Sequence, residues 1–157
     1  MHPLVDELIQ GIAQDEEEAF IGAGEIAAAS HFGFESYQVI EPYADQISSN
    51  PPTPEDIAAL KNALIEHIES GPMPTTGAAF ALGKFHDPDL TPVLRSQLAK
   101  HLQALLKYNA ALSNLLCALH NSGEKIHSNG AHSLQETDAM IADARQYLAK
   151  HGMIFPW

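Results

Sequence analysis

Apolar residues recur every three or four positions along most of this chain, which is the spacing of helices that bury one face. Residues 3–14 and 53–70 show the pattern most regularly. Their expected inward-facing residues are Val5, Leu8, Ile9, Ile12, Ile57, Leu60, Leu64 and Ile68. No stretch alternates apolar and polar residues over the length of a strand. The pattern therefore predicts an all-α protein.

Residues that favour helix ends divide this pattern into about seven helices. The clearest start is Thr53 followed by Pro54, because threonine caps a helix and proline suits its first position. Asp15 is expected to cap another helix, with Glu18 three residues later completing a capping box. The expected helices span residues 3–14, 15–33, 35–48, 53–70, 76–85, 92–120 and 133–151.

Two of these helices contain an expected interruption. Pro42 should interrupt the helix over 35–48, because proline lacks a backbone N–H and clashes with the preceding turn. The apolar run over 92–120 is long for a globular helix, so a break is expected near residues 107–109.

The C-terminal end is expected to be a capped helix followed by an apolar tail. Residues 133–136, Ser-Leu-Gln-Glu, form a capping box, and Gly152 ends the helix. The tail of residues 153–157 either covers the open end of the helices or docks a partner.

Three segments rich in alanine and glycine indicate how the helices pack. Residues 23–29, 77–83 and 109–113 each place small residues around one larger apolar residue. Small side chains let neighbouring helices approach closely, as stacked repeats require. The sequence favours a right-handed stack of helix hairpins, an α-solenoid, and leaves a closed helical bundle as the alternative.

Negative charge is concentrated in the first half of the chain. Residues 1–70 contain fourteen acids and one base, Lys61, for a formal charge of −13, whereas residues 71–157 contain six acids and seven bases, for +1. An acidic surface attracts basic partners and repels the phosphates of nucleic acid. The asymmetry predicts either a surface that binds a basic protein or a plain aid to solubility.

Length and composition indicate a single domain over residues 1–157. The chain is 45% apolar and 18% charged, which provides a core and argues against disorder. It lacks the run of roughly 20 apolar residues that a membrane span needs, and it begins without the features of a signal peptide. Cys117 is the only cysteine and is expected to be a small buried hydrophobe. These features favour a cytoplasmic protein.

Residues 79–94, Ala-Phe-Ala-Leu-Gly-Lys-Phe-His-Asp-Pro-Asp-Leu-Thr-Pro-Val-Leu, resemble the core of a HEAT-type helical repeat. In that pattern an Ala/Leu-rich helix ends at glycine, a short Asp-Pro turn follows, and a second helix opens with Pro-x-Leu. The resemblance implies a HEAT-like superhelix of paired helices. With its small size and acidic charge, the chain is also similar to immunity proteins that neutralise bacterial polymorphic toxins.

Nine histidines raise the question of a metal or catalytic site. The one Glu-x-x-His motif of the di-iron type, residues 124–127, lies in a loop sequence without a second copy. His127 with His132 is the remaining candidate pair for a transition metal, whereas others, such as His31 and His101, are expected at helix ends or on the surface. No nucleophile elbow and no phosphate-binding loop is present. We predict no catalytic residue, no metal ligand and no cofactor.

The sequence therefore predicts a non-catalytic inhibitor of the immunity type, whose acidic half covers the basic face of a cognate toxin. A nuclease is the expected toxin, because such enzymes hold phosphates with Lys and Arg. Tyr37 and Tyr43 lie among acids and suit an interface, although core packing would explain them equally well. The expected partner-binding residues are Glu16, Glu17, Glu25, Glu35, Tyr37, Glu41, Tyr43 and Asp45. The alternatives are a HEAT-like adaptor in a regulatory complex, and a helical metal-binding protein or enzyme.

Overall fold

A computed structural model describes residues 1–71, 73, 75–104, 109–126 and 137–153. Within these residues the protein is all-α, with eight α-helices, one short 3-10 helix at Pro88–Leu90 and no strand. The α-helices are α1 (Pro3–Ala13), α2 (Glu17–Phe32), α3 (Tyr43–Ile47), α4 (Pro54–Ser70), α5 (Thr76–Gly83), α6 (Thr91–Gln103), α7 (Asn109–Asn121) and α8 (Thr137–Lys150). The predicted fold class is confirmed.

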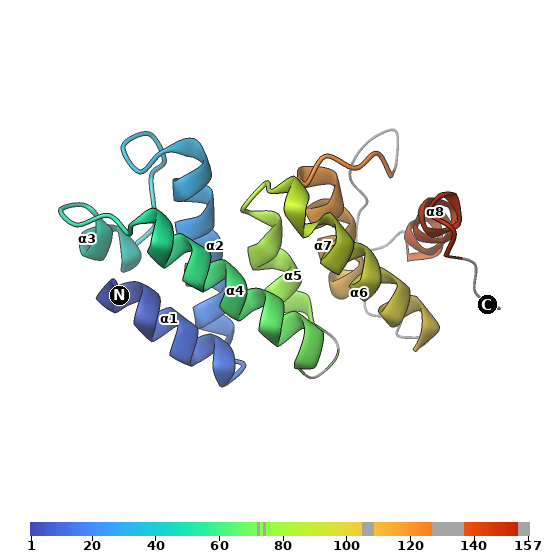
Figure 1. Ribbon diagram of the computed structural model, residues 1–157, viewed down its shortest axis with the longest axis horizontal. Coiled ribbons are helices and arrows are strands. Elements are labelled where there is room, and N and C mark those ends of the chain that lie inside the picture. Colours follow the sequence, from blue (N-terminus) through green and yellow to red (C-terminus); the bar gives the residue numbers. More distant parts are fainter. Residues whose placement is uncertain (72, 74, 105–108, 127–136, 154–157) are drawn as a thin grey trace.

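The helices lie in two rows along the long axis of the molecule (Figure 1). Helices α1, α4 and α6 form the row toward the viewer, and α2, α5 and α7 form the row behind it, with neighbours in contact in each row. Across the rows, α1 contacts α2, α4 contacts α5, and α6 contacts α7. Helix α8 lies at the far end against α6 and α7. The acidic N-terminal residues and the C-terminal helix are therefore at opposite ends, and the assignment to the HEAT class stays a prediction.

Small residues allow close packing in the row of α2, α5 and α7. A Cβ atom on Gly77 would lie 2.6 Å from the ring of Phe20, and one on Gly24 would lie 3.0 Å from the ring of Phe80. Each ring thus packs against a glycine of the neighbouring helix. The three segments rich in small residues belong to these three helices, so the close approach expected from the sequence is present.

One cluster of buried apolar residues continues through both rows from α1 to α8. Its largest fully buried side chains are Leu4, Ile12, Ile26, Leu60, Leu64, Ile68, Leu82, Leu94, Leu98, Leu112, Leu115 and Leu119. Burial of apolar surface contributes roughly 25 cal/mol per Å². The predicted inward faces of residues 3–14 and 53–70 are buried, with Ile9 only partly so. This core fixes the helices that carry the surface residues described below.

The start of α4 agrees with its prediction, and the start of α2 does not. The Thr53 hydroxyl accepts a hydrogen bond from the Asp56 N–H at 3.2 Å, and the Asp56 carboxylate accepts one from the Thr53 N–H at 2.8 Å. Helix α2 instead begins at Glu17, after a cap residue, Glu16, whose side chain makes no capping hydrogen bond. The predicted capping box at Asp15 is therefore wrong.

Asp15 turns the chain between α1 and α2 instead of capping a helix. Its φ of 58° lies in the left-handed region, which aspartate tolerates better than most residues. Its carboxylate lies 3.0 Å from Nε2 of His67 on α4. The Asp15 side chain, which the local pattern predicted to cap a helix, therefore contacts a distant helix instead.

The helix predicted over 35–48 is wrong except for its last turns. Helix α2 ends at Gly33, which has a φ of 101°, and α3 begins only at Tyr43. Pro42 lacks a backbone N–H and disfavours a helical conformation at Glu41, so α3 does not extend further back. The segment before α3 is free to fold against other helices.

The remaining boundaries agree with the sequence where the structure describes them. The expected break in the run over 92–120 is confirmed, since α6 ends at Gln103 and α7 begins at Asn109. Cys117 is half-buried rather than buried. The capping box at 133–136 and the tail after Met153 lie outside the described residues. Met153 is partly buried and packs on the core.

Candidate partner-binding surface

The segment of residues 33–47 folds back onto α1 and α2 at one end of the molecule (Figure 1). Val39 and Ile47 are buried in the core. The backbone N–H of Ile40 donates a hydrogen bond to the Glu25 carboxylate at 3.4 Å. These contacts anchor the segment, which connects α2 to α4 and carries two of the predicted tyrosines.

Tyr43 lies along α2 with its ring over Gly22. A Cβ atom on Gly22 would lie 2.9 Å from two carbons of the Tyr43 ring and 2.7 Å from the side chain of Leu8. The Tyr43 hydroxyl donates a hydrogen bond to the carbonyl oxygen of Glu18 at 3.0 Å. The missing side chain at Gly22 therefore makes room for the ring.

Three glutamates lie near Tyr43, and one of them, Glu25, also interacts with Tyr37. The pKa of Tyr43 is raised first by burial and then by the negative charges of Glu18, Glu7 and Glu25. The pKa of Tyr37 is raised by burial and by its interaction with Glu25. Among the described residues, no Lys or Arg pairs with any of these three carboxylates. We refer to these five residues as the tyrosine edge.

A small cleft of about 160 Å³ opens beside the tyrosine edge between α1, α2 and α3. Its acidic lining consists of Glu7, Glu16 and Glu18, and Tyr43 and Gln46 form part of its wall. Carboxylates form charge-assisted hydrogen bonds with Lys and Arg, and a tyrosine ring attracts a cation to its face. The lining therefore suits a basic side chain.

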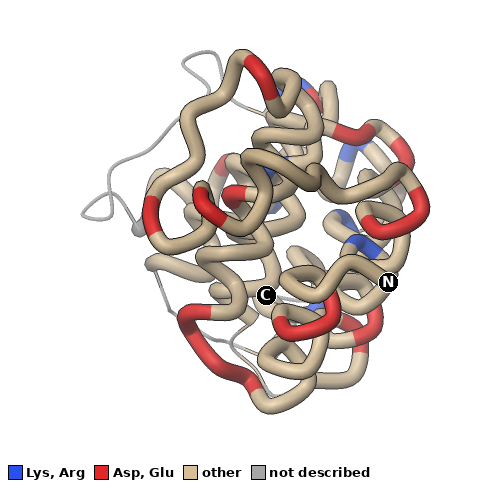
Figure 2. The backbone as a smooth tube through the Cα atoms, turned by 90° about the vertical axis from the view of Figure 1, so that its left-hand side faces the viewer, with Lys and Arg blue, Asp and Glu red and all other residues tan. Residues whose placement is uncertain are grey.

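The other predicted partner-binding residues lie on different sides of α2. Glu35, Glu41 and Asp45 are exposed on the segment of residues 33–47. Glu16 lines the cleft described above, whereas Glu17 lines another hollow between α2, α5 and α7. Figure 2, which looks onto this end of the molecule, shows Asp and Glu positions around the whole outline and few Lys or Arg positions. The structure thus brings Glu25 close to Tyr37 and Tyr43, places Glu16 in a cleft with Tyr43, and places Glu17 apart from them.

The sequence pattern does not single out Glu7, and it assigns Glu18 only to helix capping. Glu7 lies on α1, and no local spacing connects it with Tyr43. The sequence does contain one indication that another group packs close to Glu18. Gly22 follows it by one helical turn, and a glycine inside a helical pattern marks a close approach by another group.

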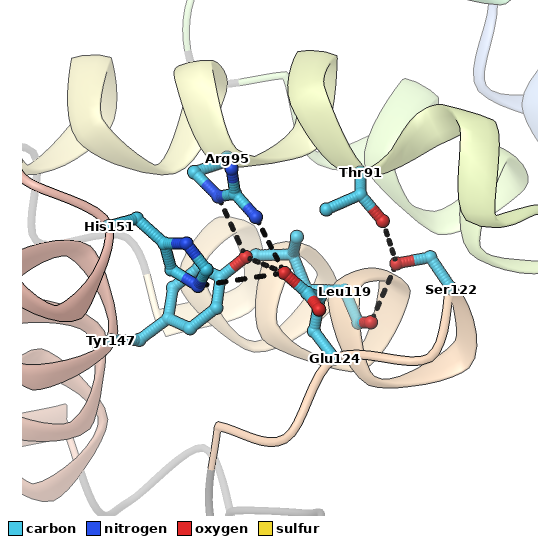
Figure 3. Close-up of polar contacts among 7 residues, drawn as sticks. All are labelled: Thr91, Arg95, Leu119, Ser122, Glu124, Tyr147 and His151. Atoms are coloured by element: carbon cyan, nitrogen blue, oxygen red, sulfur yellow. Dashed lines mark hydrogen bonds and ion pairs between the residues drawn. The ribbon is translucent and has the colours of Figure 1, made fainter.

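A second group of charged and aromatic residues connects α6 with α8 (Figure 3). Arg95 donates hydrogen bonds from Nη2 to the Glu124 carboxylate at 2.6 Å and from Nε to the Tyr147 hydroxyl at 3.0 Å. The Tyr147 hydroxyl donates to the same Glu124 oxygen at 2.7 Å, and His151 Nε2 lies 3.7 Å from it. We refer to these four residues as the arginine cluster.

The arginine cluster is internally neutralised. Hydrogen bonds with Tyr147 and Arg95 hold the pKa of Glu124 below its ordinary value. Burial is the first cause that raises the pKa of Tyr147 to about 12. Beside the cluster, the Thr91 and Ser122 hydroxyls lie 2.8 Å apart, and Ser122 donates to the Leu119 carbonyl oxygen (Figure 3). These contacts fix the turn after α7 against α6, a structural role.

One histidine expected at the surface is fully buried. His101 donates from Nδ1 to the Gln97 carbonyl oxygen at 2.8 Å and accepts from the Thr75 N–H through Nε2 at 3.3 Å. Burial lowers the pKa of His101, and a neutral ring satisfies both contacts. The surface prediction for His101 is wrong, because this ring connects α6 to the start of α5.

In the part of the chain that the structure describes, no three His, Cys, Asp or Glu side chains lie close enough to hold a metal ion. His127 and His132 lie outside that part, so the prediction for this pair is untested. None of the described helices has both the length and the apolar character needed to cross a membrane.

No family model, no curated protein and no solved structure matches this chain.

Proposed function

We propose that this protein is a non-catalytic binding protein that inhibits a basic protein partner, in the manner of the immunity proteins that neutralise bacterial toxins. The observation that carries the proposal is the tyrosine edge, where two half-buried tyrosines lie among three glutamates that pair with no Lys or Arg of the described residues.

A Lys or Arg of a partner protein would supply the positive charge that the tyrosine edge lacks. The negative charges of Glu7, Glu18 and Glu25 act together on Tyr43, and a partner Lys or Arg placed there would be attracted by all three. Tyrosine rings add a large contact area at little entropic cost, which is why they are frequent anchors in interfaces. Charge attraction would also raise the association rate by roughly 10- to 1,000-fold.

The expected target is a toxin with a basic active site, and a nuclease fits best. A nuclease needs Lys and Arg to hold phosphates, so an acidic protein competes for the same surface. The two rows of helices support this proposal, since stacked helical hairpins of the HEAT type present extended surfaces to partners. We place the encounter in the cytoplasm, which suits a chain with one cysteine.

The two-row arrangement also favours a second candidate function, a HEAT-like adaptor in a regulatory complex. Such an adaptor would bind its partner without inhibiting it. The distinction therefore depends on the activity of the bound partner.

The test is co-purification from the native host at low salt, with an edge variant and a matched control. The edge variant carries Glu7→Lys and Glu18→Lys, and the control carries Glu66→Lys and Glu69→Lys on the exposed side of α4. Both variants change the net charge equally. We expect the wild-type protein and the control to retain one basic protein, which the edge variant loses.

The captured protein is then assayed for nucleic-acid cleavage with and without the purified chain. Inhibition at one-to-one stoichiometry supports the immunity role. Binding without inhibition favours the adaptor. An acidic partner, or a partner retained equally by the edge variant, would falsify the proposed surface.

A further inference from the structure

A larger hollow of about 410 Å³ lies on the row formed by α2, α5 and α7. Phe20, Ile21 and Phe80 form its apolar part, and Asp15 and Glu17 lie at its edge. Ile21 is 39% exposed, although it is a large apolar residue on a well-packed helix. We refer to this hollow as the α2–α5 groove.

Packing fixes the floor of the α2–α5 groove. The Phe20 ring lies where a Cβ atom on Gly77 would be only 2.6 Å away, and the Phe80 ring packs in the same manner on Gly24. Each ring thus packs against a glycine on the opposite helix. A preformed apolar floor of this kind costs little conformational entropy when a ligand binds.

Acidic residues line one end of the α2–α5 groove, and a lysine lies just outside the other end. Asp15 and Glu17 lie where α2 begins, and Asp15 already contacts His67. Glu17 pairs with no Lys or Arg of the described residues. At the other end Lys84 lies beyond Phe80, with its Nζ atom 5.1 Å from the ring centre. A ligand with one positive charge would therefore bind in one direction only.

We propose that the α2–α5 groove is a docking site for a partner segment that carries a large apolar side chain with a lysine or arginine a few residues away. The apolar side chain contacts Ile21 and Phe80, and the base reaches Glu17. Lys84 repels a base placed at the opposite end.

Charge complementarity selects this occupant. A purely apolar segment would leave Glu17 without a partner at the edge of a covered surface, which costs free energy. An acidic segment would meet like charges at Asp15 and Glu17. The inference rests on the proposed function, since it assumes that the partner is basic, but it places the contact on a different face from the tyrosine edge.

The test uses synthetic peptides, so it does not depend on capturing the natural partner. The probe peptides carry one phenylalanine and one arginine a few residues apart, in both orders. Matched peptides replace the arginine with glutamine or the phenylalanine with serine. Binding to isotope-labelled protein is followed by amide chemical shifts and by fluorescence anisotropy.

Four variants of the protein accompany the peptides. Ile21→Ser and Glu17→Gln alter exposed groove residues, and Thr76→Arg fills the groove without changing its floor. Ile40→Ser is the matched control, because Ile40 is 51% exposed and lies outside the groove. Retained amide spectra show that each variant folds.

We expect peptides with both side chains in one order to bind and to shift the amides of α2 and α5. Each matched peptide and each groove variant should weaken binding at least about tenfold, whereas Ile40→Ser should not. Absence of binding at millimolar peptide, equal binding of the glutamine peptide, or binding unchanged by Ile21→Ser overturns the proposal.

Two further outcomes separate this inference from the proposed function. If the protein self-associates in ultracentrifugation and Ile21→Ser abolishes the dimer, the occupant is a second copy and the proposal is wrong. If the natural partner is lost by the edge variant but kept by Ile21→Ser and Thr76→Arg, the proposed function stands and the groove inference fails.

Discussion

The tyrosine edge and the arginine cluster both combine tyrosine with glutamate, but only the arginine cluster contains a base that neutralises the carboxylate. In the arginine cluster, Arg95 donates to both Glu124 and Tyr147, so the carboxylate and the hydroxyl are satisfied inside the protein. At the tyrosine edge, Tyr43 lies near the charges of Glu7 and Glu18, and no described Lys or Arg joins them. The deciding difference is the presence of Arg95.

This comparison distinguishes a structural group from a candidate interface. A partly buried ion pair such as Arg95–Glu124 is coupled to folding, because removal of one partner leaves the other charge unsatisfied. Exposed carboxylates that repel one another contribute little to folding and leave their charge available to a partner. We therefore expect substitutions in the arginine cluster to change stability and substitutions at the tyrosine edge to change binding.

The largest expected effect is that of Arg95→Met, which removes the base but keeps most of the apolar stem. Glu124 and the Tyr147 hydroxyl would lose their donor, and the free energy of unfolding should fall by about 2–4 kcal/mol. Urea denaturation measures the change. The control Lys125→Met removes an exposed base beside the cluster and should change stability by less than about 0.5 kcal/mol. Equal effects of the two variants would show that the cluster is not structural.

Glu124→Gln tests the same cluster through its pH dependence. The pKa of Glu124 is lowered in the folded protein, so its ionised form stabilises the fold above the pKa of an ordinary glutamate. That stabilisation is lost as the pH falls through the lowered pKa. The variant should be about 1–3 kcal/mol less stable than the wild-type protein at neutral pH, and the two should converge in acid. A difference that stays constant down to low pH would contradict the assignment.

Two Tyr→Phe substitutions compare the regions directly. Tyr147→Phe removes a hydroxyl that bonds to Arg95 and Glu124 and should cost about 1 kcal/mol. Tyr43→Phe removes one exposed hydrogen bond and should cost less, about 0.5 kcal/mol.

The two tyrosines also differ in titration. The raised pKa of Tyr147, about 12, means that its stabilising contribution is present below the pKa of a free tyrosine and is lost as the pH rises through about 12. Residue-specific NMR of the ring carbons measures both titrations. Ionisation of Tyr147 at a lower pH than Tyr43 would contradict the proposed difference between the two regions.

The smallest effect, and one of opposite sign, is expected for Glu7→Gln. Removing one of the like charges around Tyr43 should leave stability unchanged or raise it by up to about 0.5 kcal/mol. Added salt screens exposed charges, so the difference between variant and wild-type protein should shrink as salt increases. A clear loss of stability would mean that Glu7 has a structural partner.

The sequence predicts the helices well where their cause is local. The start at Thr53 depends on contacts within four residues, and the buried face of α4 follows from its apolar spacing. Pro42 does not interrupt a helix as expected, because it lies directly before α3, and the residues that precede it fold onto α2 instead of forming a turn of helix.

What the sequence does not predict depends on long-range contacts. Asp15 meets His67, which is 52 positions away, and Arg95 meets Tyr147 across another 52. The buried His101 accepts a hydrogen bond from the Thr75 N–H, and the spacing of apolar residues in the sequence does not predict this contact. Of the candidate surface, the two tyrosines come from the local mixture of aromatic and acidic residues, and Glu25 is one of the acids predicted to bind a partner. Glu7 joins them only through the packing of α1 on α2.

A substitution at Gly22 could change the position of Tyr43 in the tyrosine edge during evolution. It lies beneath the Tyr43 ring and beside Leu8, so even one added methyl group must displace the ring or the helix. A descendant with alanine at this position would present a shifted tyrosine to the same partner, although every surface residue was inherited unaltered. Divergence of specificity could therefore begin at a position that no partner touches.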